Sequence, residues 1–217
     1  MKKLPKGNLK EFLARFIIES DAIESINDNP DLVKTQLNKN STKGHVGALL
    51  LVEDMARKKE KVLTEGMVRE VQRLITSEQH TKEGGPFIPL EYIGSYRTVG
   101  VRVGGRIAPP PTSVPALMMN WAARVETWQK NSYQQNITNL LKIARFHFEY
   151  EHIHPFADGN GRSGRAVVYY LMRYCELEPF IFTAADRFDT YYRCFQDPEA
   201  MCQYFEKNWQ DETKLYK

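Results

Sequence analysis

The sequence predicts an all-α fold, mainly a helical bundle, with one small β-hairpin. Apolar residues recur at helical spacing through most of the 217 residues. One segment, 92–111, instead alternates β-branched and polar residues, and its Gly104-Gly105 dipeptide is typical of a hairpin turn. With 42% hydrophobic and 12% aromatic residues, the chain can bury a sizeable core.

Three helices are expected in the first part of the chain. The first apolar run begins at Asn8, and Pro30 is expected to end it. A second helix is expected around 46–55. A third should follow Thr64, whose hydroxyl can cap its first turn.

The segment 80–111 differs from its surroundings. Pro109, Pro110 and Pro111 exclude both a helix and a central strand, so the hairpin is expected at the surface. Helical spacing returns afterwards. Further helices are expected at 114–128 and 137–152, from near Arg162, at 186–195 and at 199–209.

Charge and composition exclude several classes of protein. A net charge of +3 is too small to imply nucleic-acid binding, and no run of eighteen apolar residues predicts a membrane span. The first residues lack an apolar core of the kind found in signal peptides. The three cysteines (Cys175, Cys194 and Cys202) have no C-x-x-C spacing and are expected to be reduced thiols of a cytoplasmic protein.

The stretch HIHPFADGNGRSGR, residues 152–165, predicts an anion site between two helices. Pro155 disfavours helical backbone at His154, so the preceding helix should end there. Gly159 and Gly161 allow a sharp turn and a close approach to a ligand. A new helix beginning near Arg162 leaves its first N–H groups free to bind an anion.

The side chains of this stretch match phosphate chemistry. Arg162 and Arg165 are three residues apart on one helix face, and guanidinium groups pair well with phosphate oxygens. Asp158 is suited to holding Mg²⁺ beside a triphosphate, and His154 is suited to act as a general base. Together they predict transfer of a phosphorus-centred group from a nucleotide to a hydroxyl.

Other interpretations remain open at this point. Taken singly, each residue also fits a helix–turn–helix with arginines on a solvated face. Gly159–Gly164 formally matches G-x-G-x-x-G, but a helix rather than a buried strand precedes it, which disfavours dinucleotide binding. His147, His152 and His154 leave a zinc hydrolase as a minor alternative, although His147 and His152 are five residues apart on a helix.

The sequence HPFADGNGR, followed by Ser163, Gly164 and Arg165, resembles the signature H-x-F-x-D/E-G-N-G-R-x-x-R of Fic proteins at every defined position. The resemblance implies a helical domain with a β-hairpin flap that transfers AMP from ATP to a Ser, Thr or Tyr hydroxyl of a target protein. We expect N-terminal helices at 1–60 and a Fic-type catalytic domain at 61–217, packed as one globular unit.

The resemblance also implies roles for the signature residues that face the reaction. His154 would be the general base that deprotonates the target hydroxyl, and Phe156 would anchor the loop in the core. Asp158 would bind Mg²⁺ (or Mn²⁺) between the α- and β-phosphates of ATP.

The rest of the signature would hold the phosphates. Asn160 and the backbone around Gly159 and Gly161 would form the anion cradle. Arg162 would bind phosphate oxygens and Arg165 the γ-phosphate. Relatives that phosphorylate have a lysine where this chain has Gly161, so the resemblance favours adenylylation.

Two more segments resemble parts of the family. Residues 95–103 are similar to the flap that binds a target peptide by strand addition, which implies docking by Tyr96, Arg97, Thr98, Val99 and Val101. DRFDTYYRCF resembles a segment with a tyrosine near the adenine, here Tyr191 or Tyr192. Both tyrosines fit a core position equally well.

The segment ESDAIES, residues 19–25, resembles the inhibitory helix of many Fic proteins, S/T-x-x-x-E-G/N. Ser20 and Glu24 match, whereas Ser25 replaces the usual Gly or Asn. The resemblance implies that Glu24 pairs with Arg165 and displaces the γ-phosphate. In some relatives this glutamate aligns water for removing AMP, so the reverse reaction is also open. The alternative interpretation is that Glu24 is an ordinary exposed glutamate on a helix, without an inhibitory role.

The expected partners are a target protein of unknown identity and the chain itself as an acceptor, without nucleic acid or membrane, in a monomer or homodimer. Two alternatives to AMP transfer remain. One is transfer of UMP, phosphocholine or the γ-phosphate by the same fold, and the other is a catalytically silent ATP-binding module.

Overall fold

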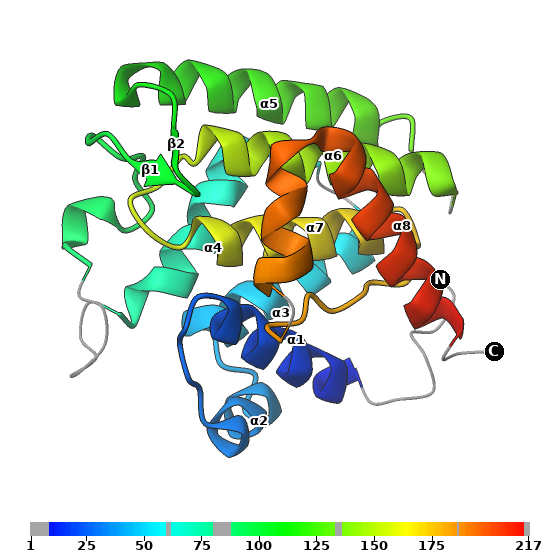
Figure 1. Cartoon of the computed structure of the whole chain (residues 1–217). Coiled ribbons are helices and arrows are strands. Elements are labelled where there is room, and N and C mark those ends of the chain that lie inside the picture. The colour runs from blue at the N-terminus through cyan, green and yellow to red at the C-terminus, as the bar shows by residue number, and fades with distance from the viewer. Residues whose placement is uncertain (1–8, 60–61, 80–87, 133–135, 186, 215–217) are drawn as a thin grey trace.

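Helix α7 (Asn160–Tyr174) forms the centre of the fold in the computed structural model, which describes residues 9–59, 62–79, 88–132, 136–185 and 187–214. All of its residues except Gly161 and Arg173 are buried. The helices packed against it are α1 (Leu9–Ile23), α3 (Gly44–Lys58), α4 (Glu65–Ser77) and α6 (Ile137–Ile153). In Figure 1, α6 lies above α7 while α1 and α3 lie below it.

The helices expected in the first part of the chain are confirmed as α1, α3 and α4. Thr64 caps α4 as expected, because its Oγ1 accepts a hydrogen bond from the N–H of Met67 at 3.3 Å. The expectation for Pro30 is wrong: Pro30 begins a further helix, α2 (Pro30–Asn38). Proline suits the first helical turn, where no N–H is needed, and Asn29 caps that turn.

The hairpin is confirmed but shorter than expected. Strand β1 (Arg102–Val103) pairs antiparallel with β2 (Arg106–Ile107), and Gly104 and Gly105 form the turn with φ values of 55° and 81°. Residues 95–101 form no strand. A short 3₁₀ turn, η1 (Leu90–Tyr92), precedes the hairpin, and residues 80–87 lie outside the described ranges.

The three prolines after the hairpin were expected to exclude any helix, and that expectation is wrong for Pro111. This residue begins a 3₁₀ turn, η2 (Pro111–Ser113), that leads directly into α5 (Val114–Gln129). The fixed φ of proline is compatible with the first position of a helical turn, so only a helix interior is excluded.

The C-terminal part follows the predicted order with shifted boundaries. Helix α7 begins two residues earlier than expected. The predicted segment 186–195 is a π-helical turn η3 (Arg187–Tyr191) followed by a 3₁₀ turn η4 (Tyr192–Gln196), with Asp186 outside the described residues. Helix α8 (Pro198–Lys214) is longer than 199–209 and packs on α6. All three cysteines are buried and unpaired with one another.

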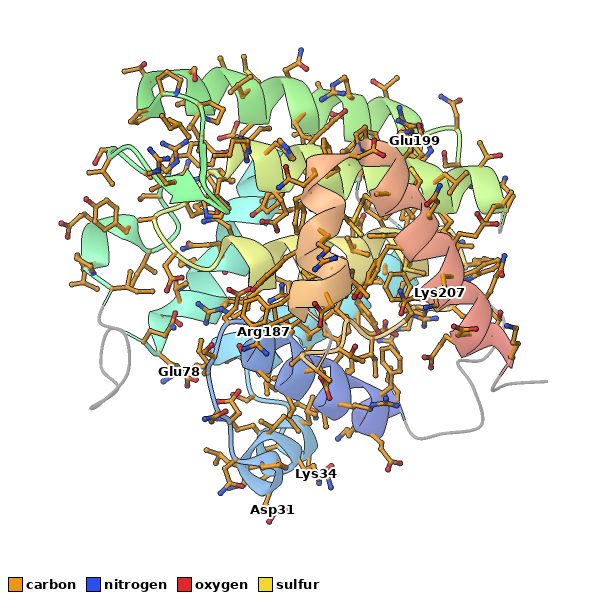
Figure 2. The ribbon with its side chains drawn as sticks, viewed as in Figure 1. Asp31, Lys34, Glu78, Arg187, Glu199 and Lys207 are labelled. Atoms are coloured by element: carbon orange, nitrogen blue, oxygen red, sulfur yellow. The ribbon has the colours of Figure 1, made fainter. Side chains whose placement is uncertain are left out.

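Many charged residues lie at the surface. In Figure 2, Asp31 and Lys34 project from α2, and Glu199 and Lys207 project from α8. No helix within the described ranges is long and apolar enough to cross a membrane.

Candidate active site

Residues 154–165, which we call the signature loop, comprise the connection from α6 to α7 and the beginning of α7. His154 ends α6 in a left-handed conformation (φ 49°), and its N–H donates to the carbonyl of Tyr150 at 2.9 Å. Phe156 is fully buried and packs against Tyr96, so it anchors the loop as expected. The chain therefore reverses direction with the His154 imidazole at the end of one helix and the phosphate-type residues at the start of the next.

Asn160 closes the loop. Its Oδ1 accepts from the N–H of Phe156 at 2.8 Å, and its Nδ2 donates to the carbonyl of the same residue at 2.9 Å. Because the amide is only 3% exposed and both its ends are used, it shapes the loop rather than pointing into open space. From α4, Gln72 adds a further hydrogen bond to the carbonyl of Asp158 at 3.0 Å.

Two glycines of the loop are required by space. Gly159 has φ 77°, and a Cβ built on it would lie 2.8 Å from the methyl carbon of Thr76. A Cβ on Gly161 would lie 2.2 Å from Oε1 of Glu24 and 2.9 Å from Nη1 of Arg165. Gly161 therefore provides the space in which the Glu24 carboxylate and the Arg165 guanidinium meet.

Arg165 is 1% exposed and is bonded to α1 and the residue just beyond it. Its Nε donates to Oγ of Ser20 at 2.9 Å, and its Nη2 donates to the Ser20 carbonyl and to Oε1 of Glu24, both at 2.8 Å. Burial opposes the charge of Arg165, but Glu24 raises its pKa above the ordinary arginine value. The structure thus brings Ser20, Glu24 and Arg165 together.

Arg162 lies on the same side of α7 and faces a different part of α1. Its guanidinium contacts Oε1 of Gln79 at 3.2 Å, Oδ2 of Asp158 at 3.4 Å and Oδ1 of Asp21 at 3.9 Å. It is 3% exposed, and its Nε has no hydrogen-bond partner among the described residues.

Sequence reasoning missed the pair formed by Asp21 and His45. Oδ2 of Asp21 lies 2.9 Å from Nδ1 of His45, and both residues are buried. Burial alone would raise the pKa of Asp21, but the charge and hydrogen bond of His45, with Arg162, hold it below its ordinary value. The available signal was the placement of Asp21 beside Ser20, on the apolar side of α1.

Arg97 was predicted to dock a target, but its side chain is 1% exposed and unavailable for such contact. It donates to the carbonyls of Val99, Pro109, His154 and Ile153. Its backbone N–H also donates to the carbonyl of Pro155 at 3.0 Å. Arg97 therefore ties the base of the hairpin to the signature loop, a role that its charge in the sequence did not indicate.

The other predicted docking residues lie along the same segment. Thr98 and Val99 are exposed, Tyr96 and Val101 are half-buried, and Val101 accepts a hydrogen bond from Ala108 across the base of the hairpin. The part of this segment that remains accessible is thus narrower than predicted and centres on Thr98 and Val99.

His154 and Glu151 are two of the ionisable groups at the end of α6. Burial lowers the pKa of His154 to about 4, so its imidazole is neutral near pH 7 and able to accept a proton. Burial raises the pKa of Glu151 to about 8. Sequence reasoning missed Glu151, since an acidic residue in a charged helical run is normally solvated.

Asp158 is the predicted metal ligand. Its carboxylate is 41% exposed, with Oδ1 accepting from the N–H of Gly159 at 2.6 Å and Oδ2 near Arg162. No cluster of three His, Cys, Asp or Glu side chains suited to a metal exists in the described part of the chain. A nucleotide-bound Mg²⁺ needs only one or two protein carboxylates, so the half-exposed oxygen of Asp158 fits that use.

The two tyrosines predicted near the adenine differ. Tyr191 is 1% exposed, shares a 2.7 Å hydrogen bond with His147 and has its ring 6.0 Å from the Arg165 guanidinium. Tyr192 is half-buried, and its hydroxyl donates to the carbonyl of Ile23 at 3.2 Å. Tyr191 is thus a core residue beneath Arg165, while Tyr192 is the more accessible of the two.

The three histidines of α6 do not converge on one point. His147 pairs with Tyr191, and Nδ1 of His152 bonds to the carbonyl of Phe148 while its ring stacks on that residue. Burial lowers the pKa of His147 to about 3. This arrangement gives no support to the zinc alternative, and the helix before Gly159 leaves the dinucleotide motif without its strand.

A cavity of about 970 Å³ opens beside these residues, at the upper end of the size range of small-molecule sites. Its walls come from the signature loop, the hairpin turn and the η3–η4 segment. The lining residues are Glu24, Glu151, His152, His154, Gly161, Arg165, Arg102, Val103, Gly104, Gly105, Arg106, Phe188, Tyr191, Tyr192, Phe195 and Gln196.

A model of the Fic/DOC family matches residues 62–172. The chain is 32% identical over 115 residues to the protein adenylyltransferase Fic of Drosophila willistoni, a match that covers 53% of this chain. That match spans only 22% of the relative, so the similarity concerns about a fifth of its length.

Two solved structures share the fold. A Fic domain containing signaling protein from Bacteroides thetaiotaomicron aligns with a TM-score of 0.73 at 20% identity, covering 92% of this chain and 84% of the other. Fic-1 from C. elegans (residues 134–508) aligns with a TM-score of 0.70 at 16% identity, covering 96% and 63%.

Proposed function

The chain belongs to the Fic/DOC family, and on that premise we propose that it is a protein adenylyltransferase whose site is blocked by Glu24. The observation that carries the proposal is the double use of Arg165. This buried guanidinium lies in the phosphate-type loop and is bonded to Glu24 in the same cavity that His154 lines. The adenylyltransferase name of the relatives supports AMP as the group transferred.

The reaction we propose joins a target hydroxyl to the α-phosphorus of ATP. The hydroxyl oxygen forms the new P–O bond, the bond to the β-phosphate breaks, and pyrophosphate leaves. The hydroxyl proton goes to His154, whose lowered pKa keeps the imidazole neutral and ready to accept it. The cavity beside His154 gives both reactants access to that side chain.

The phosphates would lie over the start of α7. The first N–H groups of this helix point toward the loop, which favours an anion there. Arg162 and Arg165 would bind phosphate oxygens, with Arg165 on the γ-phosphate. Asn160 would act through the loop shape that it maintains, and Gly159 and Gly161 through the close approach they permit.

Asp158 would hold the Mg²⁺ (or Mn²⁺) that accompanies ATP. The metal would neutralise charge on the α- and β-phosphates. The chain's own contribution is the carboxylate, kept half-exposed at the mouth of the loop by its bond to the Gly159 N–H.

The blocked state follows from charge. Glu24 occupies the position beside Arg165 that a γ-phosphate needs, and two anions cannot share one guanidinium edge without repulsion. Ser20 reinforces the block, because its hydroxyl and carbonyl accept two further hydrogen bonds from Arg165. Removal of Glu24 would therefore restore productive ATP binding. The same carboxylate could orient water for the reverse reaction, removal of AMP.

The target would dock on the flap, and its identity is open. Thr98 and Val99 are the exposed residues of that segment, and strand addition would use their backbone groups. Tyr192 is the better candidate for an adenine contact. The division into residues 1–60 and 61–217 is retained as part of the proposal, supported by a family match that begins at residue 62.

The test uses ATP labelled at the α-phosphate with wild type, Glu24→Gly and Glu24→Gly/His154→Ala. Because a hydrogen bond between charged groups contributes about 1.5–3 kcal/mol, Glu24→Gly should transfer AMP about 10- to 100-fold faster than wild type. Loss of His154 should lower that rate by about 10²- to 10⁴-fold. Glu11→Gln, an exposed carboxylate on α1, is the matched control and should behave as wild type.

Mass spectrometry of modified proteins, including the chain itself, identifies the group and acceptor. If Glu24→Gly labels neither itself nor any protein in a lysate, the proposal is wrong. Label from γ-phosphate but not from α-phosphate would point to phosphorylation and reject AMP transfer.

A further inference from the structure

Glu151 is a buried carboxylate that the reaction described above does not use. It lies in the last turn of α6, is 7% exposed and lines the cavity. Its Oε1 has no hydrogen-bond partner among the described residues. Its Oε2 lies 3.8 Å from Nδ1 of His154, a buried atom that likewise has no hydrogen-bond partner there.

The fold makes room for this carboxylate. A Cβ on Gly164 would lie 2.4 Å from Oε1 of Glu151 and 3.0 Å from the ring of Tyr150. Burying a carboxyl oxygen without a partner is unfavourable, because the group loses its water without replacement. Oε1 of Glu151 and Nδ1 of His154 are thus buried without partners on two side chains that approach to 3.8 Å through Oε2, which indicates an interaction made in another state of the site.

Charged and titratable groups from every neighbouring element surround Glu151. Arg165 of α7 lowers its pKa, and Glu24 raises it, but burial is the largest influence and raises it to about 8. Tyr191 of η3 and Tyr192 of η4 also interact with it electrostatically.

Three further groups complete these surroundings. Arg106 of β2 approaches the Glu151 carbonyl at 3.5 Å, and Tyr150 lies beside it on α6. His154 is the third. Near pH 7 Glu151 and His154 are therefore both largely neutral, and two protons, one from the carboxyl group and one from the imidazole, are distributed over three sites: a carboxyl oxygen, Nδ1 and Nε2.

We propose that Glu151 is a positioning residue for His154: as a carboxylate it accepts the Nδ1–H bond and leaves Nε2 free to take the proton of the target hydroxyl. This inference rests on the proposed function. When Glu151 carries the proton instead, it donates to Nδ1, and the imidazole hydrogen stays on Nε2. In that state His154 cannot accept a proton at Nε2. Ionisation of Glu151 thus converts the Nε2–H tautomer of His154, which cannot accept the hydroxyl proton, into the Nδ1–H tautomer, which can.

The proton balance involves Glu151, His154 and the solvent. Ionisation of Glu151 releases one proton to solvent, and the imidazole hydrogen moves from Nε2 to Nδ1. The hydroxyl proton then adds to Nε2, and the resulting imidazolium lies beside a carboxylate that stabilises it. A carboxylate that orients and stabilises a histidine in this way is an established arrangement in other enzymes.

The kinetic test uses the Glu24→Gly chain as parent and adds Glu151→Gln or Glu151→Met. We expect kcat to fall about 10-fold with Gln, which keeps an acceptor without a charge, and about 100-fold with Met, which keeps neither. KM for ATP should stay within about twofold. Glu149→Gln, two residues earlier on the exposed face of α6, is the control and should leave kcat unchanged.

The pH profile separates positioning from a merely structural role. In the parent, kcat should rise with pH on a limb that reports ionisation of Glu151, and this limb should be absent from Glu151→Gln. Because Glu24 raises the pKa of Glu151, the limb of the Glu24→Gly parent should lie at lower pH than that of the wild type. A parent limb that persists unchanged in Glu151→Gln contradicts the proposal.

A second readout does not depend on transfer. In protein labelled with ¹⁵N-histidine, the His154 signals, assigned by their loss in His154→Ala, should change from protonated Nε2 to protonated Nδ1 as pH rises. Glu151→Gln should abolish that pH-dependent change. If the parent transfers no AMP, the proposed function fails, and this measurement alone decides the role of Glu151. Identical tautomer titrations in parent and Glu151→Gln would overturn it.

Discussion

The signature loop and helix α1 meet at Arg165 but are held in opposite ways. Asn160 bonds to Phe156 and Ser163 to Gly159, four residues away in each case. The contacts of Arg165 with Ser20 and Glu24 cross 145 and 141 residues. The bonds that close the loop are thus local, although Gln72 and Arg97 also bond to it, whereas the α1 contacts with Arg165 come only from a distant segment. This difference suits the proposed function, in which the loop is a permanent part of the site and the Glu24 contact is released.

Arg165→Ala should cause the largest loss of stability because Arg165 belongs to both regions. The substitution removes a large buried side chain and leaves the buried hydroxyl and carbonyl of Ser20 without their donor, and each buried polar group left unsatisfied costs about 1–3 kcal/mol. Urea unfolding of wild type and Arg165→Ala measures this difference. A loss below about 1 kcal/mol would mean that α1 is not held through Arg165.

Asn160→Ala tests the loop alone. It removes the partner of the buried N–H and carbonyl of Phe156, and because water can enter the space left by the amide, we expect a loss of about 1–3 kcal/mol. AMP transfer by the Glu24→Gly chain should fall with it. An unchanged transfer rate in folded Asn160→Ala would contradict the view that loop shape holds the phosphates.

Asp21→Asn weakens α1 without touching Arg165. Since Asn can still accept a hydrogen bond from His45, the loss near neutral pH should be about 1 kcal/mol. The pKa of Asp21 is lowered in the folded state, so its contribution is present above about pH 4, the unfolded value, and is lost as pH falls below it. Unfolding curves at pH 3 and pH 6 should therefore differ less in Asp21→Asn than in wild type.

Glu24→Gln should have the smallest effect on stability. The Glu24 side chain is 32% exposed, and ion pairs open to solvent contribute about 0–1 kcal/mol. The free energy of unfolding should stay within about 1 kcal/mol of wild type while transfer rises. A loss as large as that of Arg165→Ala would show that α1 cannot leave the site without unfolding the domain.

The contrast between local and long-range contacts also explains which features could be predicted from the sequence. The loop was predictable because its determinants, Pro155, Gly159 and the two arginines, lie within a few residues of one another and act through local backbone rules. The Asp21–His45 pair was not, because pairing across 24 residues depends on how α1 and α3 pack. Residue type was a poor guide to burial at two positions. Arg97 and Glu151 are buried, although arginine and glutamate are usually solvated.

Pro30 was misread for a related reason. A proline ends one helix or begins the next, and periodicity alone did not separate the two, whereas Asn29 as a cap decides it. The family resemblance supplied two expectations that local rules could not. One is AMP as the transferred group, and the other is Glu24 as a competitor of the γ-phosphate for Arg165. The geometry around Arg165 then gave that resemblance a physical form.

The central claim is that Glu24 and the terminal phosphate of ATP compete for Arg165. The most direct test is calorimetric titration of wild type and Glu24→Gly with Mg-ATP and with AMP, which lacks the terminal phosphates. We predict that Glu24→Gly binds ATP at least about tenfold tighter than wild type, with AMP affinity unchanged within about twofold. An equal gain for both nucleotides, or none for ATP, would contradict the claim.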